Sequence, residues 1–383
     1  MLTEKKSLGE IGESFIGLTY KPTDVVSEGG VIVFRSSNIQ NGCMDYKDIV
    51  RVNKKVKEKL ITKKDDLLVC ARNGSARLIG KNAILHEIDA NQTFGAFMMV
   101  FRSDINHFVH QLLNTRRYSS QVSENLGARI NQITSSDLQS FEFFFPKENS
   151  EMNKIAALLD LLDERIATQN KIIDKLQSLI KGVMVELQKQ GVDRGAWKKI
   201  SLGAVLSERK ERNTNLYQVF SVSVSQGVVN QLDYLGRSFA AKDTSKYNVV
   251  HYGDLVYTKS PTGSFPYGIV KQCLNLENVA VSPLYGVYEP QNLAVGAYLH
   301  EYFMSEINTH NYLHPLIQKG AKNTINITNQ RFLENCVLLP TNINELLQIS
   351  KLLRSLNNKI KYQQYILQQY QKQKQYLLRQ MFI

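Results

Sequence analysis

The chain repeats itself at a distance of about 190 residues. The segment GAKNTINITNQRFLENCVLLP, residues 320–340, resembles GARINQITSSDLQSFEFFFP, residues 127–146, and both end in an apolar run closed by proline. The two closing prolines, Pro146 and Pro340, are 194 residues apart, as are Thr134 and Thr328. A period of this length is far too long for a solenoid, so it predicts two copies of one domain and its connector.

The same offset relates other parts of the two copies. Ser7-Leu8-Gly9 recurs at residues 201–203, whereas Asp66-Leu67 recurs as Asp254-Leu255 at an offset of 188, as insertions and deletions in loops would cause. A chain of 383 residues is also expected to hold two domains. We therefore predict a globular domain over 1–146, a helix and linker over 147–196, a second globular domain over 197–340 and a second helix over 341–383.

The two connectors carry the heptad pattern of a coiled coil. From Ile155 to Leu187 the seam positions follow at alternating steps of four and three, and Gln169 alone among them is polar. The seam beginning at Ile349 also has a glutamine, Gln363, near its middle. A helix of about 40 residues spans roughly 60 Å and needs a partner for its seam. We expect the two helices to pair antiparallel within the chain; two separate homodimeric coiled coils are the alternative.

The two glutamines lie near the centres of their predicted helices. An antiparallel pairing would bring Gln169 and Gln363 into one layer, where each amide could bond the other. A buried polar layer fixes register at some cost in stability. We therefore predict that this layer sets the distance between the two globular domains.

Each globular part combines short strand-like runs with one helical stretch. The runs include DLLVCA and FMMVF in the first copy and DLVYTK and GIVKQCL in the second, with breaks rich in Gly, Asn and Ser. Residues 107–126 and 294–318 have helical character. The predicted fold class is α+β, with two duplicated domains, each holding a mostly antiparallel or mixed sheet, separated by two long helices.

The composition favours a polyanionic partner. The net charge is +12 with a pI near 9.3, and residues 341–383 alone contribute +6. The four cysteines form no CxxC pair, the first residues lack the apolar core of a signal peptide, and no apolar run reaches 18 residues. We expect a cytoplasmic protein with no membrane segment.

The motifs of common active sites are incomplete in this sequence. GSARLIGK, residues 74–81, has five residues between its glycines where a P-loop needs four, and Asn82 follows where Ser or Thr would bind magnesium. His107 and His110 are three residues apart, but their helix offers no companion carboxylate, so we expect a structural role for them. Glu208 and Lys210 lack the preceding Pro-Asp of a nuclease motif. The chain is therefore expected to be a recognition subunit and no enzyme.

This organisation closely resembles the specificity (S) subunit of Type I restriction–modification systems. The marks are the repeated Ser-Leu-Gly, the two Asp-Leu strands, the Gly-Ala-basic loop before a strand ending in proline, and NKIAALLDLLDERIATQNKIIDKLQ, which looks like the first spacer helix of that family. Family members commonly show Glu-Gln before the Lys-Ile-Ala run, where this chain has Glu151-Met-Asn153.

The resemblance implies a role in reading double-stranded DNA. Each globular part would be a target-recognition domain for one half of a bipartite site, and the helices would dock two methylation (M) subunits. Those subunits would carry S-adenosylmethionine, and restriction (R) subunits would bring ATP and Mg²⁺ chemistry. The chain itself would need no cofactor and no metal.

Loops at the sheet edges are the expected source of DNA contacts, since base readout needs polar side chains that reach base edges. In the first domain the candidates are Arg35, Ser36, Asn38, Arg72, Asn73, Ser75, Arg77, Arg129 and Asn131. In the second domain they are Ser223, Gln226, Lys259, Ser260, Thr262, Lys322, Asn323 and Thr324. Two other functions stay open: a nuclease or methyltransferase with an unrecognised active site, and a coiled-coil scaffold that does not bind DNA.

Overall fold

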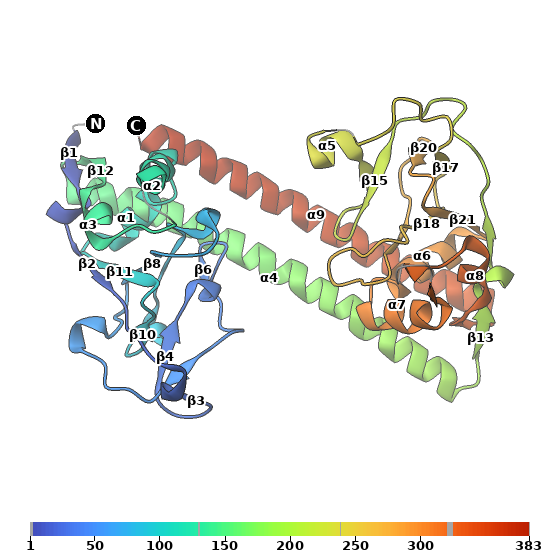
Figure 1. Cartoon of the computed structure of the whole chain (residues 1–383), viewed down its shortest axis with the longest axis horizontal. Helices are drawn as coiled ribbons and strands as arrows, with labels where there is room; N and C mark the ends of the chain where they lie inside the picture. Colours follow the sequence, from blue (N-terminus) through green and yellow to red (C-terminus); the bar gives the residue numbers. More distant parts are fainter. Residues whose placement is uncertain (1–2, 129–130, 238, 320–324, 383) are drawn as a thin grey trace. The chain divides into compact units, whose positions relative to one another are not determined.

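The computed structural model describes residues 3–128, 131–237, 239–319 and 325–382 (Figure 1). The chain forms two compact units. The first is Met1–Lys171 with Gln364–Ile383, and the second is Ile172–Gln363. Each unit therefore contains one globular copy and a part of both long helices, and we describe each by itself.

An antiparallel sheet is the centre of the first unit. Its strand order is β2-β11-β8-β9, with β2 at Glu13–Ile16, β11 at Met98–Arg102, β8 at Leu67–Cys70 and β9 at Asn82–Ile84. Strand β8 is fully buried, and its alternate residues enter two different cores: Leu67 and Val69 join one, while Leu68 and Cys70 join the other. A continuous apolar run is what a strand covered on both faces requires.

Smaller sheets complete the first copy. Strands β10 (Thr93–Phe94), β4 (Val31–Phe34), β7 (Arg51–Val52) and β3 (Val25–Val26) form a sheet in that order, in which β10 and β4 are parallel. A hairpin joins β5 (Ile39–Gln40) to β6 (Cys43–Met44), and β1 (Thr3–Ser7) pairs with β12 (Glu142–Pro146). The expectation of mixed and antiparallel sheets with helices is therefore confirmed for this copy.

The helical stretch expected over residues 107–126 is two helices. Helix α1 (Asn106–Leu112) ends and α2 (Arg116–Ala128) begins around Thr115, whose hydroxyl accepts a bond from the Tyr118 amide at 3.4 Å. The second copy breaks at the same place, between α6 (Leu293–Tyr302) and α7 (Glu306–Leu313), where Ser305 caps α7. Hydroxyl side chains favour such starts because they satisfy free backbone N–H groups. Helix α3 (Ser135–Ser140) follows in the first copy.

The second unit repeats the main sheet and the closing strand pair. The order β14-β21-β18-β19 matches that of the first copy, with β14 at Leu206–Glu208, β21 at Gly286–Pro290, β18 at Leu255–Tyr257 and β19 at Val270–Gln272. Strand β13 (Trp197–Ser201) pairs with β24 (Cys336–Pro340) so that Trp197 faces Pro340, just as Thr3 faces Pro146. The 194-residue offset of the sequence is thus a repeat of structure and register.

The remaining elements of the second unit differ in detail from the first. They are the pairs β15 (Phe220–Ser223) with β16 (Gly227–Asn230), β17 (Asn248–Val250) with β20 (Val279–Val281) and β22 (Gln318–Lys319) with β23 (Ile325–Asn326), and the helix α5 (Gln231–Leu235). Helix α8 (Asn329–Glu334), by contrast, repeats α3 at the offset of 194, with Thr328 as its N-cap where α3 has Thr134. Differences between the copies therefore gather outside the shared sheet.

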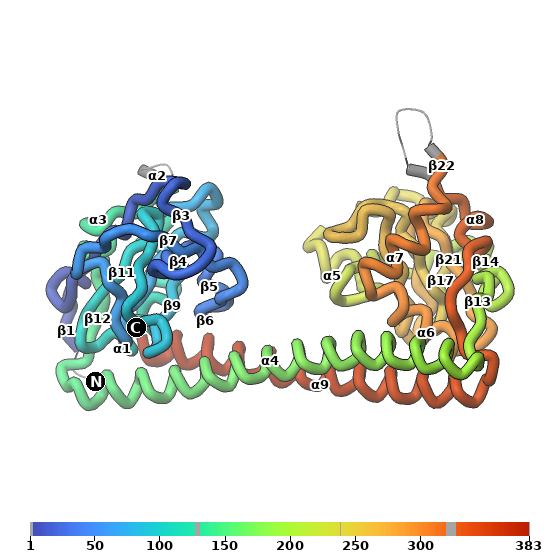
Figure 2. Tube along the Cα trace, turned by 90° about the horizontal axis from the view of Figure 1, so that it is seen from below, coloured from blue at the N-terminus to red at the C-terminus, as the bar shows by residue number. Residues whose placement is uncertain are grey.

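Two long helices, α4 (Asn149–Asp193) and α9 (Ile343–Met381), carry the heptad seams. In the first unit the start of α4 lies against the end of α9, since Leu159, Leu162 and Leu378 share one core (Figure 2). In the second unit the residue after α4, Arg194, binds Glu345 at the start of α9 at 3.2 Å. Opposite ends meet in each unit, so the predicted antiparallel direction is confirmed.

The predicted domain boundaries and the glutamine layer stay predictions. Helices α4 and α9 begin two residues after the predicted starts, at Asn149 and Ile343. Gln169 is 6% exposed in the first unit, while Gln363 belongs to the second unit. Within the described ranges, no helix combines the length and apolar character that crossing a bilayer requires.

Candidate nucleic-acid interface

Three segments of the first copy, distant in sequence, meet in one surface cluster. The Asn73 amide donates to the Ser36 hydroxyl at 3.0 Å, and the Asn131 amide donates to the Gly74 carbonyl at 3.2 Å. We call residues 35–40, 72–78 and 131–132 the first loop cluster. It follows β4 and β8 and precedes α3, which is the sheet-edge position that the sequence predicted.

Arg72 is held more firmly than an ordinary surface arginine. Its own N–H and that of Ala71 donate to the Phe97 carbonyl at 3.0 and 2.9 Å, and its backbone forms a β-bridge with Gln132. Its guanidinium lies over the Phe97 ring, 5.2 Å from the centroid, and both side chains are exposed. Arg77 is also exposed, on the short turn Ala76–Leu78, while the half-buried Ser75 donates its backbone N–H to Asn73 Oδ1 at 3.0 Å.

Two of the predicted contacts in this cluster hold the loop together. Asn38 has no exposed surface, and its amide donates to the carbonyls of Asp45 and Asp48, each at 3.0 Å. Arg35 forms an ion pair with Asp48 at 2.6 Å. The Asn38 prediction is corrected to a structural role, because a side chain without exposed surface has no face to offer a base. Arg129 lies outside the described residues.

The second loop cluster consists of residues 223–226, between β15 and β16, and residues 259–265, after β18. The two segments approach each other, since a Cβ built on Gly263 would lie 3.9 Å from the Val224 side chain. Thr262 and Phe265 exchange two backbone bonds of 3.0 Å, which makes the second segment a tight turn. Gln226 and Ser260 are exposed in the cluster.

The other candidates of the second copy have mixed positions. Ser223 is 4% exposed and donates to the Tyr234 hydroxyl at 3.1 Å, so its prediction is also corrected to a structural role. Lys259 is half-buried with a φ of 57°, and burial lowers its pKa. The Thr262 hydroxyl is bonded to the Ser260 carbonyl at 3.0 Å. Lys322, Asn323 and Thr324 lie outside the described residues.

A buried aspartate anchors the strand that leads into each cluster. Asp66 precedes β8 and receives two bonds from Arg102, of 2.7 and 2.6 Å, while Asp254 precedes β18 and receives two from Arg209, of 2.6 and 3.1 Å. Both carboxylates are 1% exposed. The bonds that each arginine donates to its carboxylate raise the pKa of the arginine, whereas burial raises the pKa of Asp254 against the effect of Arg209. These Asp–Arg clamps fix the starts of the strands and hence of the loops.

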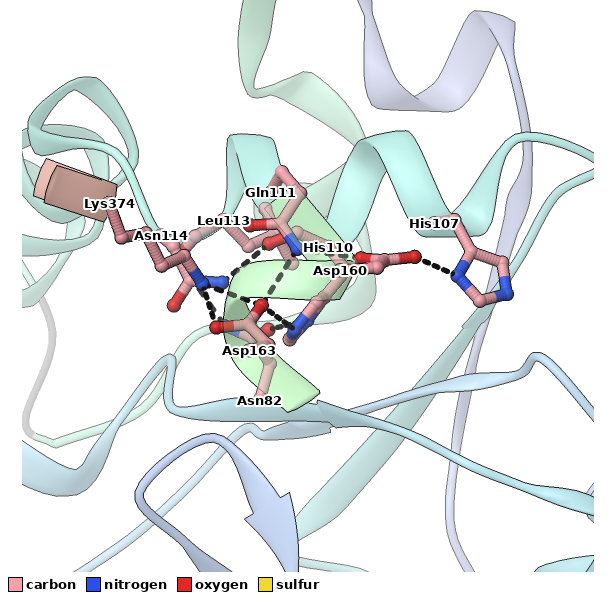
Figure 3. A network of polar contacts seen from close by, with 9 residues as sticks. All are labelled: Asn82, His107, His110, Gln111, Leu113, Asn114, Asp160, Asp163 and Lys374. Atoms are coloured by element: carbon pink, nitrogen blue, oxygen red, sulfur yellow. Dashed lines mark hydrogen bonds and ion pairs between the residues drawn. The ribbon is translucent and has the colours of Figure 1, made fainter. Parts of the chain in front are cut away.

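A polar network connects the first copy to its part of the long helices (Figure 3). Gln111 of α1 donates to Asp160 at 2.8 Å and to Asp163 at 2.9 Å, both on α4, and Lys374 of α9 binds Asp163 at 2.5 and 2.7 Å. His107 Nδ1 lies 2.5 Å from Asp160, which raises the pKa of the histidine.

The network reaches the sheet through His110. Its Nδ1 lies 2.9 Å from Asn82 Oδ1, and because the Asn82 amide donates to the Gly80 and Leu113 carbonyls, this ring nitrogen carries the proton. Burial lowers the pKa of His110 to about 4, so the ring is neutral. The carboxylates that His107 contacts, Asp65 and Asp160, come from other elements and not from the helix of the histidine.

The sequence signal for this network lies on α4. Asp160 and Asp163 are one turn apart on a seam-facing helix, which is a costly place for two carboxylates unless a partner domain neutralises them. Both carboxylates are paired with side chains of the network itself. We therefore assign the network a structural role, in which it joins the first copy to its part of the long helices. No group of three or more His, Cys, Asp or Glu side chains able to hold a metal occurs in the part of the chain that the structure describes.

Comparison with known proteins finds similarity to one kind of protein. Residues 2–178 match the family model of the Type I restriction modification DNA specificity domain. The chain is 27% identical over 173 residues to the Type I restriction enzyme EcoKI specificity subunit of Escherichia coli (strain K12), and 26% identical over 174 residues to the Type I restriction enzyme StySPI specificity subunit of Salmonella potsdam. Each match covers 43% of this chain and 37% of the relative.

The fold likeness extends over the whole chain. The crystal structure of the Type I restriction–modification S subunit from M. genitalium matches with a TM-score of 0.62 at 14% identity, covering 100% of this chain and 96% of that one. At this identity the match concerns the fold, and it includes the second copy that the family model does not reach. Residues 2–178 are thus similar to the Type I restriction modification DNA specificity domain, and the chain as a whole shares the fold of the S subunit from M. genitalium.

Proposed function

We propose that this chain is the DNA sequence-recognition subunit of a Type I restriction–modification complex. Each globular copy reads one half of a bipartite, asymmetric site, with the first copy at 1–146 and the second at 197–340. The long helices over 147–196 and 341–383 separate the two copies. The observation that carries this proposal is the repeat of one sheet, each copy bearing a cluster of polar and cationic loops at the same strand end.

The charge distribution supports a duplex as the ligand. The net charge of +12 supplies phosphate contacts, whose displaced counterions make binding weaken with salt. Two similar domains suit half-sites that recur on one face of the helix about every turn, roughly 34 Å apart. Such a ligand is consistent with a cytoplasmic location.

The chemistry of the complex is assigned to its partners. Two methylation (M) subunits would dock on the helices and bring S-adenosylmethionine, and restriction (R) subunits would bring ATP and Mg²⁺. In this scheme the chain is a non-catalytic scaffold, and exposed side chains of the two loop clusters contact the DNA, some of them at bases and others at phosphates.

The test is to express the chain with its methylation subunit and to map methylated adenines by single-molecule sequencing. The expected result is one split, asymmetric motif that disappears when this chain is omitted. Replacing residues 1–146 with the equivalent domain of a relative should change one half of that motif. Methylation that needs no such chain, or a swap that alters both halves, would refute the proposal.

The alternatives are separated by assays of the chain alone. Cleavage or methylation of DNA by the purified chain with Mg²⁺ or S-adenosylmethionine would identify an enzyme. If neither the chain alone nor its complex binds DNA even at low salt, the chain is a scaffold that does not recognise DNA. The proposal predicts weak DNA binding by the chain alone, with a steep negative dependence on salt.

A further inference from the structure

Arg72 and Phe97 form a cation–π pair on the surface of the first loop cluster. Phe97 is 57% exposed, although a benzene ring in water is unfavourable, and its exposed ring lies beneath the Arg72 guanidinium. The backbone of Arg72 is fixed by its bond to the Phe97 carbonyl and its bridge to Gln132. Stacking on the ring therefore orients a guanidinium whose main chain is already rigid.

Two other arginines near the strands of this copy are held in ion pairs. Arg35 is paired with Asp48, and Arg102 with Asp66. Within the described ranges, Arg72 has no carboxylate within ion-pair distance, so its planar set of donors is available to a ligand. The amide of Asn73, bonded to Ser36, lies beside it in the same cluster.

We infer that Arg72 reads a guanine in the half-site of the first copy, with Phe97 as its positioning residue. This inference rests on the proposed DNA-recognition function. A guanidinium held in one plane can donate two parallel bonds to guanine O6 and N7 in the major groove, and no other base offers that pair of acceptors. A phosphate contact needs neither the stacking nor the fixed backbone, because a mobile cation serves equally well.

The second copy lacks this pair. At the offsets of 188 for β18 and 187 for β21, the positions of Arg72 and Phe97 are occupied by Ser260 and Leu284, and Leu284 is 73% exposed. A hydroxyl next to an aliphatic side chain cannot make the bidentate contact. The second copy stacks an arginine on a phenylalanine elsewhere, at Arg237 and Phe239, so the guanine contact inferred for Arg72 applies to the half-site of the first copy.

The experiment compares the methylated motifs of cells that express the complex with wild-type chain or with Arg72→Ala, Arg72→Lys or Arg77→Ala. Arg72→Ala and Arg72→Lys are both expected to relax one G·C position in one half of the motif, by about tenfold or more in relative methylation. Arg77→Ala, an exposed arginine of the same loop, should lower methylation at all positions alike and leave the motif unchanged.

Phe97 is tested by a conservative rescue. Phe97→Leu should relax the same G·C position as the Arg72 variants, whereas Phe97→Tyr, which keeps an aromatic face, should retain the wild-type motif. A merely structural role for Phe97 would lower the amount of methylation without changing which base is selected.

The outcomes separate this inference from the proposed function. If wild-type chain directs no split motif, the proposed function fails. If wild-type chain directs a split motif but Arg72→Ala keeps it unchanged, Arg72 reads no base and the guanine inference is overturned. A first half-site that contains no G·C pair would also overturn it.

Discussion

In each copy an arginine neutralises the buried aspartate that precedes the central strand, but the two arginines do not occupy equivalent positions. In the first copy the arginine that binds Asp66 is Arg102 on β11, and Phe15 on β2 packs under its guanidinium. In the second copy the position of Arg102 is Glu289 and that of Phe15 is Arg209, which binds both Asp254 and Glu289. The aspartate stayed in place while its partner moved to the neighbouring strand, which shows that the clamp is required and its source is not.

The joints between domain and helix differ in the same way. In the first unit the amide of Gln111 on α1 donates to Asp163 on α4. In the second unit the equivalent positions hold a carboxylate on α6, Glu301, and an amide on α9, Asn357, whose Nδ2 donates to Glu301 at 2.6 Å. Acid and amide have exchanged sides, so each domain complements its own helix and would place two carboxylates or two amides together on the other.

The largest effect is expected when the Asp–Arg clamp of the first copy is given the residues that form the clamp in the second copy. Arg102→Glu should destabilise the chain by about 3 kcal/mol or more, because it leaves Asp66 buried without its cation and beside a second acid. Adding Phe15→Arg should restore most of the loss. Chemical denaturation followed by circular dichroism measures both, with Glu28→Gln, at an exposed glutamate of the same copy, as a control that costs little. A double variant as unstable as Arg102→Glu would show that the two clamps are not equivalent.

The joint can be tested by the matching exchange. Gln111→Glu places a carboxylate against Asp160 and Asp163, and we expect a loss of about 2 kcal/mol, since Lys374 offsets only part of the repulsion. Combining it with Asp163→Asn should recover part of that stability. Thermal unfolding of the single and double variants provides the measurement. Equal stability of wild type and Gln111→Glu would contradict the exchange.

Each copy has a neutral histidine with a lowered pKa, buried at His110 and half-buried at His300, and this predicts how stability depends on pH. Burial lowers the pKa of His110 to about 4 and that of His300 to about 3. Because the unfolded chain takes up protons near pH 6.5 and the folded chain does not, stability should fall as pH drops below about 6.5, by about 1 kcal/mol per pH unit for each histidine.

Unfolding curves between pH 7 and pH 5 should show this slope, and it should be flatter in a His110→Gln, His300→Gln variant. His107, whose pKa is raised by Asp160, acts oppositely: its contribution is present below pH 6.5 and is lost as pH rises through the raised pKa. Ala297 stands at its position in the second copy, so His107→Gln should remove this alkaline loss. An unchanged profile in both variants would exclude these groups as its source.

The smallest effect is expected at the helix centres. Replacing Gln169 and Gln363 with leucine should raise the melting temperature slightly, because burying an amide costs more than burying an alkyl group. The same variant should accept more than one spacer length in the methylated motif if the two amides fix register. If the variant still methylates a motif with the wild-type spacer length alone, the glutamines do not fix the register of the helices.

The sequence predicted the repeated parts of this fold better than the parts between them. The strand ends at Pro146 and Pro340 and the heptad seams follow periodic patterns that packing enforces, so they could be located from spacing alone. The burial of Asn38 and Ser223 could not be predicted, because a loop asparagine or serine looks the same whether it bonds backbone carbonyls or faces solvent. The Asp160–His107 contact joins elements 53 residues apart, beyond any local pattern.

The closing strand pairs have a consequence for how such a chain can change. Because β1 pairs with β12 and β13 pairs with β24, the chain enters and leaves each globular copy through two adjacent strands. Between these strand pairs the offset between equivalent residues falls from 194 to 188 and then returns to 194. Residues missing from one part of the second copy are therefore balanced by additional residues in another part. The residues between the paired strands of each copy can therefore be substituted singly or exchanged as a whole domain. The strand pair that joins the copy to the long helices stays the same.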